Sequence, residues 1–160
     1  MENYLQFLEN AKKYAFTAEH LLTETYPVVK DPRMLLSVLQ NAFSAYKSCM
    51  MFMLYRDVAM KKIPPFENDF QAMFALFKAR AERRYSISGD YIRIIEEISA
   101  ILKEHKASPM EFSRHEMYII CSDNYKMKTI TTQQLREYIS KAKLFIDEID
   151  TGNAKHERVS

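Results

Sequence analysis

Glycine is scarce in this chain of 160 residues. Only Gly89 and Gly152 occur, where average usage would give about eleven. Sheet-rich folds and phosphate-cradling loops need glycine where φ is positive or where the backbone closely approaches a ligand. The scarcity therefore excludes dinucleotide-binding and P-loop fingerprints, and also the glycine-flanked nucleophile elbow of serine hydrolases.

The sequence also has few cysteines, and it shows neither a signal peptide nor a membrane-spanning segment. Cys49 and Cys121 are far apart and lack metal-ligand spacing, which predicts a reduced, cytoplasmic setting. The N-terminus has neither the basic segment nor the apolar run of a signal peptide. The most apolar stretch, residues 34–60, has Lys47 at its centre, so we expect a buried core helix and no membrane partner.

The charges of the chain nearly cancel. Its 23 basic and 21 acidic residues give a formal net charge of +2, so nucleic-acid binding is permitted rather than indicated. Ten Met, ten Phe and ten Tyr, without Trp, instead predict a core filled by flexible and aromatic side chains.

Hydrophobic periodicity predicts five helices, because apolar residues recur at steps of three and four. Pro27 is expected to end the first helix, and Asp31 to cap the second. Thr131 and Gln134 fit a capping box before the last. The expected ranges are 2–25, 31–61, 68–84, 88–107 and 131–149.

Residues 110–130 break the helical pattern. Residues 117–121 are β-prone, residues 122–124 favour a turn, and residues 125–130 alternate, which predicts a β-hairpin or an ordered irregular insert. The expected fold is therefore mainly all-α, an up-and-down bundle of about five helices. It forms one domain over residues 1–150, followed by a disordered C-terminal tail over residues 151–160.

Residues with catalytic chemistry are few. The four histidines offer no metal-ligand spacing, so we expect neither a metal nor a cofactor. Arg114 and His115 lie in the least regular segment, where an arginine can hold phosphate and a histidine can move protons near neutral pH. Alternatively, both are ordinary polar residues on the protein surface.

A second candidate site consists of basic residues beside tyrosines. This mixture can bind backbone phosphates while aromatic rings stack on bases, although it is also common on solvated surfaces. The residues are Arg80, Arg83, Arg84, Lys126 and Lys128, next to Tyr85 and Tyr125.

Three segments carry a likeness to a known family: residues 4–8 (YLQFL), residues 42–46 (AFSAY) and residues 111–114 (EFSR). In these, and in helix order, the chain resembles the HEPN superfamily of helical-bundle proteins, common in bacteria and archaea. Catalytic members are metal-independent ribonucleases with an Arg separated from a later His by four to six residues. None of the histidines here has such an Arg. The resemblance thus implies a non-catalytic, dimeric interaction module, often found beside a small nucleotidyltransferase.

Three functional hypotheses follow. The leading one is a cytoplasmic interaction or regulatory module that forms a homodimer, because the apolar stripes are wider than five helices would cover. An alternative is an RNA- or nucleotide-acting enzyme, in which Arg114 and His115 polarise a phosphate while Arg83 and Arg84 hold the backbone. A third is a small-ligand carrier with a pocket lined by Met and Phe.

Overall fold

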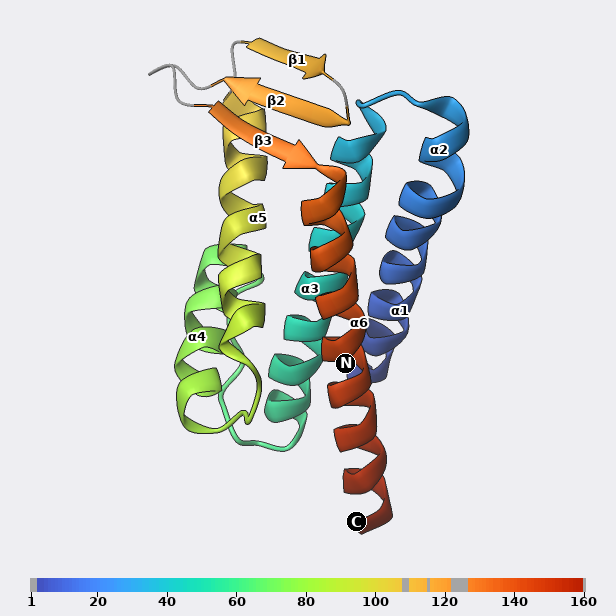
Figure 1. The fold of residues 1–160 in the computed structure, drawn as a ribbon. Coiled ribbons are helices and arrows are strands. Elements are labelled where there is room, and N and C mark those ends of the chain that lie inside the picture. The colour runs from blue at the N-terminus through green and yellow to red at the C-terminus, as the bar shows by residue number, and fades with distance from the viewer. Residues whose placement is uncertain (1–2, 108–109, 115, 122–126, 160) are drawn as a thin grey trace.

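Five long helices and a small antiparallel sheet make up the computed structural model, which describes residues 3–107, 110–114, 116–121 and 127–159 (Figure 1). This confirms the predicted mainly helical fold with a short β insert. The long helices are α1 (Tyr4–His20), α3 (Met34–Ala59), α4 (Phe70–Arg83), α5 (Gly89–Ala107) and α6 (Thr132–Val159). A π-helical turn, η1 (Leu21–Thr25), joins α1 to the short α2 (Tyr26–Val29).

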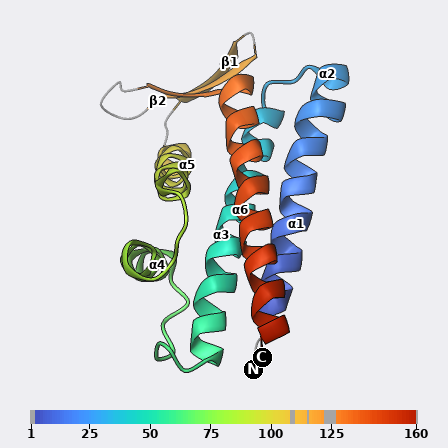
Figure 2. The same ribbon diagram turned by 60° about the horizontal axis from the view of Figure 1, so that its bottom comes forward.

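The helices form a three-helix group with a helix pair beside it. α1 lies along α3, and α6 packs against both. α4 and α5 form the pair; α4 contacts α3, and α5 contacts α3 and α6 (Figures 1 and 2). No helix in the described ranges is both long and apolar enough to cross a membrane.

The sheet covers the end of the bundle at which α5 ends and α6 begins (Figure 1). Its strands are β1 (Met110–Arg114), β2 (Met117–Cys121) and β3 (Met127–Thr131), in the order β1-β2-β3. β2 pairs antiparallel with both neighbours, and Tyr118 faces Ile130 across the second pair. The predicted hairpin is therefore one part of a three-stranded sheet, while the predicted turn at 122–124 lies outside the described residues.

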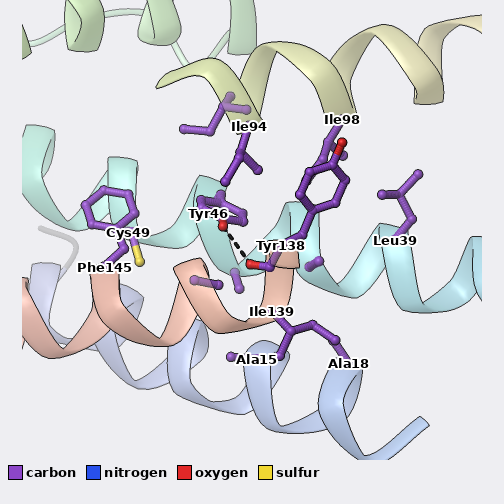
Figure 3. Close-up of a cluster of buried hydrophobic side chains, with 14 of the residues drawn as sticks. Ala15, Ala18, Leu39, Tyr46, Cys49, Ile94, Ile98, Tyr138, Ile139 and Phe145 are labelled. Atoms are coloured by element: carbon purple, nitrogen blue, oxygen red, sulfur yellow. Dashed lines mark hydrogen bonds between the residues drawn. The ribbon is translucent and has the colours of Figure 1, made fainter. Parts of the chain in front are cut away.

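Tyrosine and phenylalanine side chains link neighbouring helices across the core of the bundle. Tyr46 of α3 donates a buried hydrogen bond of 2.6 Å to the carbonyl oxygen of Tyr138 on α6 (Figure 3). Phe145 stacks on Tyr91 of α5, with ring centroids 4.4 Å apart. Such contacts add to the free energy from burial of apolar surface, because a buried hydroxyl needs a partner and stacked rings attract one another.

Side chains cap the starts of α4, α5 and α6. Asp69 Oδ2 accepts from the Ala72 amide at 3.0 Å at the start of α4, and Ser88 Oγ accepts from the Asp90 amide at 3.1 Å before α5. The capping box before α6 is confirmed. The Gln134 amide donates to Thr131 Oγ1 at 3.1 Å, and the Thr131 amide to Gln134 Oε1 at 3.4 Å.

The first helical segment does not end at Pro27, contrary to prediction. In η1 the Tyr26 amide donates to the Leu21 carbonyl, five residues back. Pro27 has no backbone N–H, and its ring would clash with the carbonyl four residues earlier in a regular α-helix. The wider π-helical turn before it allows the helix to continue past Pro27 to Val29.

Two other helix ends also differ from the expected ones. α3 begins at Met34, after a turn in which Asp31 Oδ1 accepts from the Arg33 amide at 3.0 Å. α6 continues to Val159 instead of ending near Ile149, so helix covers most of the segment predicted as a disordered tail. No proline interrupts that segment, and Gly152 is only a weak helix breaker, costing about 1 kcal/mol relative to alanine.

Candidate functional site

The basic residues predicted to act together do not lie together in this fold. Arg80 and Arg83 occupy the last turn of α4, Arg84 follows them, and Lys128 is exposed on β3. These places lie at opposite ends of the bundle, separated by the length of α5 (Figure 1). Lys126 lies outside the described residues.

The second predicted pair is described only in part. Arg114 is the last residue of β1 and pairs with Met117 of β2. His115 lies outside the described residues. The structure therefore gives no geometry for joint action of Arg114 and His115.

A polar cluster at the other end of the bundle joins α3, α4 and the segment after α4. Asp57, on the last turn of α3, is 1% exposed. Its Oδ2 accepts from Arg80 Nε at 2.7 Å and from the Tyr85 hydroxyl at 2.5 Å. Arg80 Nε also lies 3.2 Å from Tyr85 Oη, and its guanidinium carbon lies 5.5 Å from the ring centroid. The three side chains thus fix one another.

Two tight backbone turns bring these residues together. At the end of α3, Lys61 adopts a left-handed φ of 58°, and the Lys62 amide donates to the Asp57 carbonyl at 2.8 Å. At the end of α4, the Tyr85 amide donates to the Arg80 carbonyl at 3.0 Å. Each turn folds the chain back, so that Lys62 and Tyr85 lie beside the helix ends that they follow.

Asp57 occupies a position that is electrostatically unfavourable for a carboxylate. A helix C-terminus carries partial negative charge, which disfavours a carboxylate there, and burial of an ion costs several kcal/mol. Arg80 and Tyr85 offset this cost. Burial, followed by the hydrogen bond to Asp57, raises the pKa of Tyr85, which keeps the hydroxyl a donor. Partial burial opposes a rise for Arg80, yet its bonds to Tyr85 and Asp57 raise its pKa.

Further cations surround this cluster. Together with Arg80, Asp57 and Tyr85 they line a pocket of about 410 Å³, which we call the basic pocket. Its other lining residues are Arg56, Lys62 and Arg84. In the part of the chain that the structure describes, these three form no ion pair, whereas Lys12, Lys78, Arg93, Lys141 and Lys143 do.

The formal charge of the basic pocket is therefore +3, from four cations and one carboxylate. These cations lie near the C-termini of α3 and α4, where each can stabilise its helix by about 0.3–1 kcal/mol. Mutual repulsion of the cations within a concave surface works against that gain. Such an arrangement focuses a positive field and attracts anions.

Comparisons with protein-family models, curated proteins and solved structures give no significant match to this chain. Among the described residues, no group of three or more His, Cys, Asp or Glu side chains is placed to hold a metal ion.

One sequence feature could have indicated this site, namely a carboxylate on the apolar face of a helix. Asp57 follows Met53 by four residues and Met50 by seven, so it lies on the apolar face of α3. A carboxylate on a core-facing stripe needs a partner. Arg80 was among the predicted binding residues, but Asp57, Arg56 and Lys62 were not.

A second polar cluster ties α5 to the sheet. The Glu111 carboxylate bonds both His105 Nδ1, in the last turn of α5, and the hydroxyl of Tyr118 on β2. Burial and the bond to Glu111 raise the pKa of Tyr118 to about 12. The cluster joins three elements at the sheet end, and we assign it a structural role.

Proposed function

We propose that this chain is a helical binding module that recognises an anionic group, a phosphate or a carboxylate, in the basic pocket. The carrying observation is that Arg56, Lys62 and Arg84 line one concave surface without ion-pair partners among the described residues. The sequence predicted an interaction module, and this proposal adds the surface that it would use for binding.

The chemistry of the basic pocket suits an anion. Arg80 bonds Asp57 and Tyr85 through Nε, and among the described residues neither of its terminal nitrogens has an acceptor. An arginine held in this way loses little side-chain entropy when it binds a carboxylate or phosphate in a bidentate fork. Arg84 and Lys62 are exposed and add charge at the rim.

The test is calorimetric titration of the full chain with inorganic phosphate at low ionic strength. Arg84→Gln should weaken binding about tenfold, since a lost charge-assisted bond contributes about 1.4 kcal/mol or more. Arg83→Gln is the matched control, because Arg83 is exposed beside Arg84 but does not line the pocket. Equal effects of both substitutions, or no binding by the unmodified chain, would refute the proposal.

Self-association is a second candidate, supported by an exposed apolar side chain at the junction of α1 and α6. Phe16, on α1, is 69% exposed. Phe16 borders a hollow between the two helices that Lys143 and Glu19 also line. A two-fold dimer would cover this face. Light scattering should then give twice the 18.9 kDa chain mass, and Phe16→Glu should lower it to the mass of a single chain. A monomer at all concentrations would contradict the dimer.

The remaining expectations from sequence stay proposals. If the HEPN resemblance holds, a small nucleotidyltransferase should co-purify with the chain. If the chain is instead an RNA-acting enzyme, it should cleave a mixed RNA pool, and Arg114→Ala and His115→Ala should abolish cleavage with unchanged helical circular dichroism. The carrier hypothesis predicts a bound small molecule in native mass spectrometry.

A further inference from the structure

The basic pocket continues into a larger groove. This groove has a volume of about 690 Å³ and runs between α3, α6 and residues 84–87. Arg56, Arg84 and Tyr85 line both hollows. A ligand that places an anionic group in the basic pocket therefore has a neighbouring surface for the rest of its structure.

Four side chains that line the groove are aliphatic. Met53 comes from α3, Ile87 from the segment before α5, and Leu144 and Ile149 from α6. Burial of apolar surface here contributes about 25 cal/mol per Å² removed from water. The groove thus matches an aliphatic group located directly beside the anionic one.

Two carboxylates also line the groove. Asp147 and Glu148 lie on the exposed side of α6, and Glu148 Oε1 accepts from the Tyr91 hydroxyl at 2.9 Å. These groups repel a row of phosphates but accept hydrogen bonds from N–H donors. A ligand with negative charge at one end and N–H groups along its length is complementary to this surface.

We propose that the occupant is a short segment of a partner protein in which an acidic residue stands close to an aliphatic one. This inference rests on the proposed anion-binding function. The acidic side chain binds in the basic pocket, the aliphatic side chain lies against Met53, Ile87 and Leu144, and peptide N–H groups donate to Asp147 and Glu148.

This peptide segment fits the surface better than the two other ligand classes considered. RNA would bring several phosphates past Asp147 and Glu148, against the charge of both. Small-molecule sites bury about 70–90% of the ligand surface. Leu144 on the groove wall is 51% exposed, so this wall lies at the molecular surface, where an extended peptide can lie across it.

The experiment selects binders to the immobilised full chain from a displayed library of random peptides. Enriched peptides are then synthesised with a fluorescein label and measured by fluorescence anisotropy. We expect an Asp or Glu within three positions of a Leu, Ile, Val or Met in the enriched set. Replacing that acidic residue by its amide, or the aliphatic residue by serine, should each weaken binding about tenfold, equivalent to 1.4 kcal/mol.

Protein variants distinguish the two hollows. Arg84→Gln should weaken both peptide and inorganic phosphate binding. Leu144→Ser should weaken peptide binding about tenfold and leave phosphate binding unchanged. Val28→Ser is the matched control, because Val28 is 81% exposed on α2 and does not line the groove; it should change neither.

Several results would overturn the inference. These are the absence of any enriched peptide, an enriched set without the acidic and aliphatic pair, and peptide binding that Leu144→Ser does not alter. Tighter binding of a single-stranded RNA of twelve nucleotides than of any selected peptide would also overturn it. In each case the phosphate titration decides separately whether the basic pocket binds anions, so the proposed function can survive while the peptide inference fails.

Discussion

The contact between Asp57 and Arg80 should show strong energetic coupling. Asp57→Asn leaves the Arg80 guanidinium, whose side chain is 16% exposed, without its carboxylate. Arg80→Met leaves the buried carboxylate with the Tyr85 hydroxyl as its one remaining side-chain partner in the described residues. Breaking a buried pair by removing one partner costs about 3–5 kcal/mol, so each single substitution should lower the free energy of unfolding by about 3 kcal/mol or more.

The double variant should be much less destabilised than the sum of the single variants. Asp57→Asn with Arg80→Met leaves no uncompensated ion, and we expect a coupling energy of about 2–3 kcal/mol. For a chain of this size, 1 kcal/mol corresponds to about 2–4 °C in melting temperature. Each single variant should therefore melt about 6–12 °C lower.

Urea unfolding at neutral pH, followed by circular dichroism, measures the four free energies of the cycle. Tyr85→Phe provides a check within the same cluster. It removes one hydrogen bond to the buried carboxylate and should cost about 1.5–3 kcal/mol, less than loss of the Arg80 charge. Additive single effects, or single effects below about 1 kcal/mol, would refute the reasoning, because they would mean that the pair is solvated in solution.

Three further predictions concern the bundle. Gly152→Ala should stabilise the chain by about 0.5–1 kcal/mol in urea unfolding, since an added Cβ meets nothing within 4 Å in α6; a loss of stability would show that the helix does not persist there. Phe145→Ala should cost about 3–5 kcal/mol in the same assay, because it empties the centre of the aromatic core, and a cost below about 1 kcal/mol would contradict that packing. Burial opposes a fall in the pKa of Glu97, but hydrogen bonds from Tyr138 and Arg93 lower it below 4.5. The stability from Glu97 is therefore present above pH 4.5 and lost as the pH falls through the lower folded-state pKa. Unfolding curves across this range should be less pH-dependent for Glu97→Gln, and identical pH slopes would contradict the assignment.

Most helices could be predicted because their signals are local. The stripes of α3 and α5, the Ser88 cap and the capping box before α6 all depend on residues within one or two turns. Two helix ends were predicted wrongly because only local signals were used. Pro27 and Gly152 disfavour helix by their intrinsic preferences, but in the folded chain the helix continues past both.

The sequence by itself determined a mainly helical bundle, an apolar core rich in aromatic residues and a β insert near residues 110–130, since periodicity and caps act over short distances. Only the tertiary structure decided where charge accumulates. It separated Arg80 from Lys128, and it joined Arg80 to Asp57, 23 residues earlier in the chain. The basic pocket exists because α3 and α4 end side by side, and that meeting depends on packing between helices rather than on any motif.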